Sequence, residues 1–274
     1  MGDDKIAMKN YENLNILFIT QEDPFYVQLF FEEFLKNFRD PSRIKGVIIC
    51  STLGKNSLLQ LAKQMLNFYG IFGFMLMSSK YIGKRIMTLI SRFNSFNKCY
   101  SLKQLFSKYA IPVQEKVNIN SKEFIRLWKY KDIDVIVSVA SSMIFKKPLL
   151  DLPSWGCLNI HHAQLPRYRG MMPNFWQMFN NERFAGITIH RINEKLDDGD
   201  IILQSEIEIL PRETLDSLIK RSKKIGASLM IEALDKIKVG TVNYTKNDRN
   251  HSSYFSFPTK NDIKEFKARG KRIL

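Results

Sequence analysis

The chain has 274 residues, of which 45% are hydrophobic and 12% aromatic. This size suits one large α/β domain with an appendage, or two modest domains, and argues against general disorder. Its 42 Lys and Arg against 27 Asp and Glu give a formal charge of +15, which should attract anions such as nucleotides, RNA or acidic lipids without choosing among them. A merely solvated basic surface would explain the same charge.

The cysteines and the apolar stretches limit the cellular locations and the kinds of site to be expected. Cys50, Cys99 and Cys157 lie far apart, with neither the paired spacing of a zinc site nor the even number of a disulfide framework. We therefore expect no metal and a cytoplasmic location. The start of the chain is acidic and polar, unlike a secretory signal. The most apolar stretch, residues 65–77, is shorter than the ~20 residues that a transmembrane helix needs.

The first quarter of the chain has the pattern of a β-α-β unit. Residues 15–20 form a short apolar run that predicts a strand, residues 22–38 carry apolar side chains at helical spacing, and residues 45–51 predict a second buried strand. Neither G-x-G-x-x-G nor G-x-x-x-x-G-K-[ST] occurs, which argues against dinucleotide-binding and P-loop functions.

Residues 55–105 have a helical pattern in which basic and aromatic side chains alternate, and Gly70 and Gly73 weaken its middle. One interpretation is a set of helices packed on a sheet. The other is a basic amphipathic surface that contacts a membrane or a partner.

The second half alternates strands and helices. Residues 132–141 are almost continuously apolar, as in a central strand buried on both faces. The remaining predicted elements are strands at 156–162, 186–192 and 201–209 and helices at 172–181 and 212–237. Thr214 can cap the last helix, whose buried stripe would contain Leu215, Leu218, Ile225 and Leu229. The basic tail, residues 254–274, is expected to be peripheral.

This order predicts an α/β fold with a Rossmann-like, mostly parallel sheet flanked by helices and a binding crevice outside the carboxyl ends of the strands. We expect a catalytic domain at residues 1–209, with the helical basic insertion at about 55–105, and a C-terminal helix and tail at 210–274.

A polar pair marks the strand at 156–162. Asn159 and His161 share one face because side chains alternate along a strand. An amide that holds an oxyanion beside an imidazole that moves a proton suits acyl transfer. The acidic turn "KLDDGD" could bring a carboxylate to the histidine, from Asp197, Asp198 or Asp200. A purely structural interpretation fits the same residues. Asn159 and His161 would then be two hydrogen-bonded polar residues at a strand end, and the acidic segment would be an ordinary β-turn.

The run "CLNIHHAQLPRYRGMMPNFWQMFNNERFAGITIHRINEKLDDGDIILQ" resembles the central segment of the 10-formyltetrahydrofolate-dependent formyltransferases, most of all the nucleotide-aminosugar N-formyltransferases. The family pattern is N-[IL]-H, L-P-x-Y-R-G, a proline-initiated helix, G-[VI]-T-[VI]-H and L-D-x-G. The resemblance covers about residues 132–205, extends loosely to the first β-α unit, and hardly touches residues 55–105. It implies the formyltransferase fold.

The resemblance also implies residue roles. It makes Asn159, His161 and Asp197 catalytic, and it places the pteridine of N10-formyltetrahydrofolate against two backbone segments. These segments contain Met143, Ile144 and Phe145, and Asn193, Glu194, Lys195 and Leu196. His190 matches a histidine that we interpret as structural, whereas His162 and Gln164 depart from the family pattern.

The implied reaction is attack of a primary amine on the formyl carbon. The amine donor remains open among three classes. Glycinamide ribonucleotide is disfavoured because residues 20–28 lack a glycine-rich phosphate loop. Methionyl-tRNA suits the positive charge of the chain. However, only about 65 residues follow Ile209, and this segment is short for the full C-terminal tRNA-binding barrel of the family.

We favour a nucleotide-linked aminodeoxysugar on the way to O-antigen or another surface polysaccharide such as lipopolysaccharide, with no nucleic-acid partner and a possible homodimer. Residues that could line the sugar-nucleotide cleft are Arg167, Tyr168, Arg169, Asn174 and Trp176, although they would serve equally as loop anchors and helix core. Methionyl-tRNA formyltransferase is the alternative enzyme. A non-catalytic folate-fold protein that binds a membrane surface is the alternative from another class.

Overall fold

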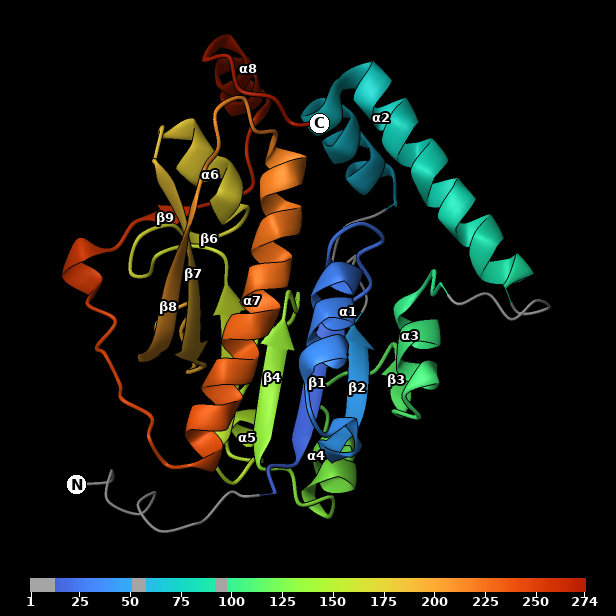
Figure 1. The fold of residues 1–274 in the computed structure, drawn as a ribbon, viewed down its shortest axis with the longest axis vertical. Coiled ribbons are helices and arrows are strands. Elements are labelled where there is room, and N and C mark those ends of the chain that lie inside the picture. The colour runs from blue at the N-terminus through green and yellow to red at the C-terminus, as the bar shows by residue number, and fades with distance from the viewer. Residues whose placement is uncertain (1–12, 51–57, 92–97) are drawn as a thin grey trace.

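A seven-stranded sheet forms the centre of the computed structural model, which describes residues 13–50, 58–91 and 98–274. The strand order is β3-β2-β1-β4-β5-β7-β8. The first five strands run parallel, and β7 and β8 are antiparallel (Figure 1). The predicted α/β fold with a mostly parallel sheet is therefore confirmed. The strands are β1 (Ile16–Gln21), β2 (Ile44–Cys50), β3 (Val113–Glu115), β4 (Val135–Val139), β5 (Gly156–His161), β7 (Phe184–Arg191) and β8 (Ile201–Glu208).

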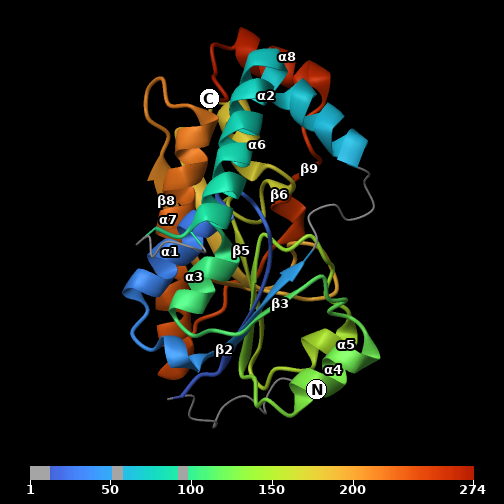
Figure 2. The same cartoon turned by 90° about the vertical axis from the view of Figure 1, so that its right-hand side faces the viewer.

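Helices cover both faces of this sheet, which explains why its central strands are apolar on both sides. Phe18 of β1 packs into the larger core with α1 and α7, whereas its neighbours Leu17 and Ile19 pack into a second core with α4 and α5. Figure 2 shows α1 and α7 on one side of the sheet and α4 and α5 on the other. The helices are α1 (Val27–Asn37), α2 (Leu58–Ile90), α3 (Leu102–Lys108), α4 (Lys122–Lys129), α5 (Lys147–Leu150), α6 (Pro173–Phe179), α7 (Leu215–Lys238) and α8 (Lys260–Ala268).

The long helix α7 belongs to the same hydrophobic core as the sheet. Thr214 caps it as predicted, since its hydroxyl accepts a hydrogen bond from the Ser217 amide. Leu215 and Leu218 are fully buried in the core that also contains Phe30 of α1. Packing is therefore continuous across the expected boundary at residue 209.

Helix α2 lies along one side of the molecule and confirms the helical pattern expected in the 55–105 segment, although residues 55–57 and 92–97 fall outside the described ranges. Gly70 breaks its regular geometry with a φ of 74°, a conformation that favours glycine. Within the described ranges, no helix is long and apolar enough to cross a bilayer.

The C-terminal segment returns to the middle of the molecule. β9 (Tyr254–Phe255) pairs in parallel with β6 (Arg169–Gly170), the end of the "LPRYRG" loop, and forms a separate two-stranded sheet. The expectation that the tail is peripheral is therefore wrong for this segment, because main-chain hydrogen bonds join it to the loop that follows β5.

Candidate active site

The predicted polar pair lies on β5, where the parallel sheet meets the antiparallel pair. Asn159 and His161 share one face of the strand, as the alternation predicted. Across the ladder, Asn159 lies opposite His190 of β7 and His161 lies opposite Thr188. The pairing therefore adds a second imidazole to the site beside the Asn159 amide.

His190 fixes the orientation of Asn159. Its Nδ1–H donates to the Arg191 carbonyl oxygen at 2.7 Å, so its Nε2 carries a lone pair that accepts from Asn159 Nδ2 at 3.1 Å. Burial lowers the pKa of His190 to about 4, although the nearby Asp197 carboxylate opposes the shift. The ring is therefore neutral near pH 7, and one Asn159 N–H remains to point at another acceptor.

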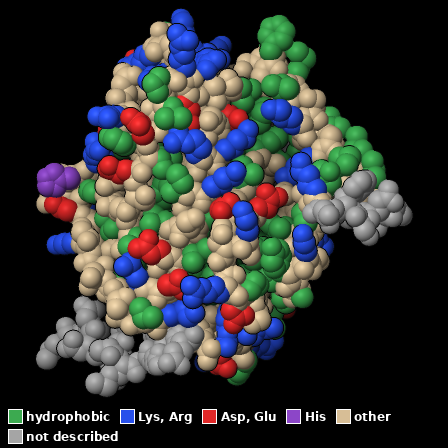
Figure 3. Space-filling model, in the orientation of Figure 1, with side chains coloured by type: hydrophobic (Ala, Val, Ile, Leu, Met, Phe, Trp, Pro, Cys, Tyr) green, Lys and Arg blue, Asp and Glu red, His purple; other side chains and the backbone are tan. Residues whose placement is uncertain are grey.

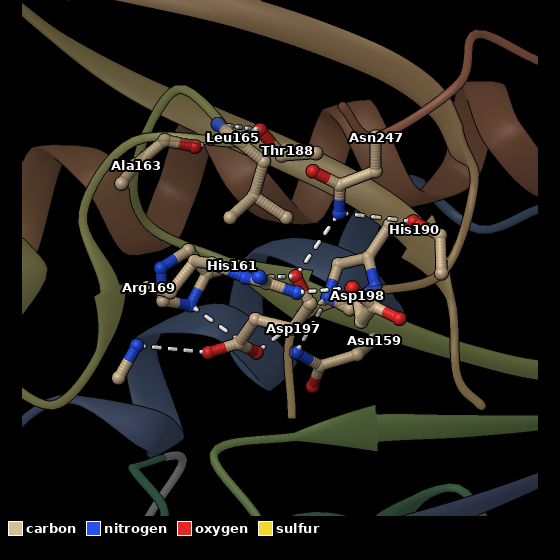
Figure 4. A network of polar contacts seen from close by, with 12 residues as sticks. Asn159, His161, Ala163, Leu165, Arg169, Thr188, His190, Asp197, Asp198 and Asn247 are labelled. Atoms are coloured by element: carbon tan, nitrogen blue, oxygen red, sulfur yellow. Dashed lines mark hydrogen bonds and ion pairs between the residues drawn. The ribbon is translucent and has the colours of Figure 1, made fainter. Parts of the chain in front are cut away.

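Asp197 comes from the loop between β7 and β8 and completes the cluster (Figure 4). Its Oδ1 lies 3.7 Å from His161 Nδ1 and 3.8 Å from His190 Nε2, and its Oδ2 accepts from the Gly170 amide at 2.9 Å. The side chains of His161 and Asp197 are each 7% exposed. The structure thus brings together all three residues that the resemblance made catalytic.

His161 is held at its other nitrogen by the following loop. Its Nε2 lies 2.7 Å from the Tyr168 carbonyl oxygen, which can only accept. Nδ1 faces the Asp197 carboxylate, another acceptor. Both ring nitrogens of His161 therefore face oxygen acceptors, which fix the orientation of the imidazole beside Asn159.

A second layer of ionic contacts holds the Asp197 loop. Arg169 Nε donates to the Asp197 carbonyl at 2.8 Å, and its Nη2 donates to Asp198 Oδ1 at 2.6 Å. Arg249 also pairs with Asp198. Burial would raise the pKa of Asp198, but the hydrogen bonds from Arg249 and Arg169 outweigh it and hold this pKa at about 2. Asp198 therefore remains a carboxylate, and it serves the loop rather than His161.

Sequence reasoning missed the contribution of the C-terminal segment. Asn247 Nδ2 donates to the main-chain oxygens of Asp197 and Gly199 at 3.0 and 3.2 Å. Neither Asn247 nor Arg249 stands in a motif, and only the long-range return of the chain brings them here. The only feature of the sequence that could have indicated these contacts was the excess of basic residues in the tail.

The residues expected to contact a folate lie on two loops. Met143, Ile144 and Phe145 follow β4, the strand next to β5, while residues 193–196 precede Asp197 in sequence. The side chains of Ile144 and Leu196 are 72% and 57% exposed, whereas Phe145 is buried. Exposed apolar side chains and nearby main chain fit a flat heteroaromatic ring. Asn193, in contrast, already donates to Asp198 and accepts from the Lys195 amide. Glu194 and Lys195 are exposed.

The five residues considered for substrate contact differ in their surroundings. Arg169 is buried in its ion pair, the Tyr168 hydroxyl donates to Glu182, and Trp176 Nε1 donates to the Ser256 carbonyl. These three have the contacts of loop anchors and helix core, the alternative left open above. Arg167 is exposed and pairs with Glu182, and Asn174 is buried, with no partner for its Oδ1 among the residues that the structure describes.

The other histidine of "NIHHAQ" points away from the site. His162 Nδ1 bonds the Ser222 hydroxyl and its Nε2 accepts from Lys223, both on α7. Burial, and then the Lys223 ammonium, hold the pKa of His162 well below its usual range. His162 is therefore a core residue. Among the described residues, no group of three or more His, Cys, Asp or Glu side chains could hold a metal ion.

Comparison with known proteins places this geometry in a family. The sequence profile described as "Formyl transferase" matches residues 87–234, more than half of the chain. The chain belongs to the formyl transferase family. The match contains every residue of the cluster around Asp197 except the C-terminal Asn247 and Arg249, and it begins only near the end of α2.

Curated members of the formyl transferase family match only a part of the chain. A methionyl-tRNA formyltransferase of Kosmotoga olearia is 36% identical over 161 residues, or 59% of this chain and 52% of the relative. One of Agathobacter rectalis is 33% identical over 159 residues, or 58% and 51%. The chain thus spans about half the length of the curated relatives it matches.

Solved structures of the family share the fold more extensively. An N-formyltransferase of Helicobacter canadensis in complex with folinic acid and dTDP-3-aminofucose has a TM-score of 0.56 and 18% identity, covering 95% of this chain and 84% of that one. A sugar 3N-formyl transferase solved with dTDP and 5-N-formyl-THF has a TM-score of 0.57 and 19% identity, with coverages of 95% and 82%. At these identities the likeness shows the fold.

Proposed function

We propose that the chain is an N-formyltransferase that moves the formyl group of N10-formyltetrahydrofolate to the primary amine of a nucleotide-linked aminodeoxysugar. The observation that carries this proposal is the convergence of Asn159, His161 and Asp197 in one buried corner. Such a corner offers an oxyanion donor, a proton donor and a carboxylate within one reaction site.

The chain's own residues divide the work of this reaction. The folate, when bound, supplies the formyl group on N10. The second Nδ2–H of Asn159, the one that His190 does not take, would donate to the formyl oxygen as negative charge develops there. Because His190 already fixes the amide, this donor is oriented before the substrate arrives.

Proton transfer falls to His161 and Asp197. The new bond joins the amine nitrogen to the formyl carbon, and the bond from that carbon to the folate nitrogen breaks. Asp197 would accept the proton that the amine loses, and His161 would donate one to the leaving nitrogen. Transfer of the proton from Asp197 to His161 would then return both side chains to their starting states.

The choice of amine rests on the solved relatives. The solved N-formyltransferases, one with dTDP-3-aminofucose and one with dTDP, each align over 95% of this chain. The methionyl-tRNA formyltransferases have higher identity but align over only 59% of it. The +15 charge serves either a nucleoside diphosphate or a tRNA. Methionyl-tRNA is therefore the second candidate, and we keep the cytoplasmic location and the route to surface polysaccharide as parts of the first.

One assay tests both candidates. The full chain is incubated with 10-formyltetrahydrofolate and a panel of dTDP-, UDP- and GDP-linked aminosugars, with charged initiator tRNA alongside. We expect a formamido sugar product from at least one nucleotide sugar. Formylated tRNA without any sugar product would overturn the first candidate, and folate binding without any product would favour the non-catalytic alternative.

A further inference from the structure

The outer face of α2 is apolar in a region where a surface helix is ordinarily polar. Its second half begins after Gly70. The most exposed apolar side chains there are Ile71, Phe72, Met75, Ile82, Ile86 and Leu89, which are between 50% and 85% exposed. We call these six residues the α2 stripe. Figure 3 shows hydrophobic side chains gathered over α2 along the upper right edge of the molecule.

Helical geometry places most of these side chains in one line. At 3.6 residues per turn, positions 71, 75, 82, 86 and 89 fall within about 60° of one another around the helix axis. The line runs for about 27 Å from Ile71 to Leu89. The opposite side of the helix meets the body of the protein, where Met77 is buried and Lys84 Nζ donates to the Pro24 carbonyl. The amphipathic pattern of α2 is thus turned outward.

The charge of the helix identifies the partner. Residues 58–90 contain Lys63, Lys80, Lys84 and Arg85 and no acidic residue. Arg85 is exposed beside the stripe, whereas Lys80 is exposed on the far side of the same helix. An apolar face on a helix whose charges are all positive is the pattern of a helix that lies in the interface of an anionic bilayer.

A second copy of the chain fits this face less well. An antiparallel pair of stripes would have its two-fold axis near residues 80 and 81, because these are the midpoint between Ile71 and Ile90. Both helices would then carry only basic charges, with no acidic side chain on either to neutralise them. Like charges on two paired helices oppose association.

We propose that α2 lies on the surface of an anionic membrane, with the α2 stripe inserted among the lipid headgroups and Arg85 at the phosphates. This attachment is independent of formyl transfer. It adds to the proposed function a location for the protein at the membrane surface.

Flotation of the full chain with vesicles tests the proposal. Vesicles of phosphatidylcholine alone are compared with vesicles that also contain phosphatidylglycerol. We expect binding to the anionic vesicles and loss of that binding as salt is raised. Arg85→Gln should weaken the preference for phosphatidylglycerol. Equal binding of the unaltered chain to both kinds of vesicle would overturn the role of charge.

A matched pair of variants tests the stripe itself. Ile86 and Leu127 are both helical and are 50% and 49% exposed, but Leu127 lies on α4, outside the stripe. Ile82→Ser with Ile86→Ser should lower vesicle binding about tenfold, whereas Leu127→Ser should leave it unchanged. Because these side chains are exposed, the variants should keep the thermal midpoint of the unaltered chain.

Two results would overturn the membrane as partner. One is the absence of vesicle binding by the unaltered chain. The other is a dimer, measured by sedimentation, that Ile82→Ser with Ile86→Ser dissociates. Neither result depends on formyl transfer, so the proposed function stands or falls separately.

Discussion

The β5–β7 site and the outer face of α2 depart in opposite ways from the usual distribution of side chains. In the site, His161, Thr188, His190 and Asp197 are buried and hold polar or ionic contacts. On α2, the stripe exposes large apolar side chains to solvent. Buried polar groups and exposed apolar patches are both costly for a folded protein, which supports the two proposals that each surface binds a ligand. The proposed ligand is polar and reactive at the site and is a lipid surface at α2.

The largest effect expected is on the reaction. Asn159→Ala or His161→Ala should lower kcat by about 10²–10³ and leave folate affinity almost unchanged, because each removes a donor that acts mainly on the developing charge. Steady-state kinetics and folate titration measure the two quantities. Asn37→Ala, which alters an exposed amide on α1, is the matched control. Wild-type turnover in both site variants would end the assignment of the trio.

A stability measurement compares the same site with α2. Thr188 Oγ1 donates to the Ala163 carbonyl and accepts from the Leu165 amide and Gln204. Thr188→Val leaves buried partners unsatisfied and should cost about 2–3 kcal/mol in the free energy of unfolding. Thr88→Val on α2, where the hydroxyl is half-buried, should cost less in the same denaturant titration. Equal losses of unfolding free energy would contradict the view that hydrogen bonds contribute more to stability in the site than on α2.

Acid should lower the free energy of unfolding through His190. Its pKa in the folded protein, about 4 because of burial, lies below the ~6.5 of an unfolded histidine. The unfolded chain therefore binds more protons between these values, and stability falls as pH is lowered from about 6.5 to 4. His190→Gln should lose about 1–2 kcal/mol less than the unaltered chain between pH 7 and pH 5. Parallel pH curves for the two proteins would exclude His190 as the group responsible.

The C-terminal contact should matter less than the trio. The Arg249 side chain is 51% exposed in its pair with Asp198, so Arg249→Ala should lower kcat by less than about fivefold. Arg249→Lys should restore part of the loss. A decrease as large as that of His161→Ala would mean that Arg249 contacts the substrate directly.

The smallest effect is expected on α2. Ile82→Asp places a charge on a side chain that is 56% exposed and should change the free energy of unfolding by no more than about 0.5 kcal/mol. A larger loss would show that the stripe is covered in the free protein, and the contrast between the two regions would disappear.

The features that were predicted best are those that depend on short-range sequence patterns. The apolar runs of β1, β4 and β5, the Thr214 cap and the shared face of Asn159 and His161 all follow from local spacing. The short edge strand β3 and the helix α4 were missed. β3 has only three residues, none of them fully buried, and therefore carries no apolar run. The partners of Asp198 were also missed, because Arg169 and Arg249 meet there only through tertiary packing.

The parallel pairing of β6 with β9 has a consequence for the order of events during synthesis. Asn159 and His161 sit on a strand whose parallel neighbour, β4, precedes it in the chain. The loop that bears Gly170, whose amide holds Asp197, gains its strand partner only when residues 254–255 have emerged. The sheet strands β4 and β5 can therefore pair before the loop that holds the Asp197 carboxylate gains its own strand partner.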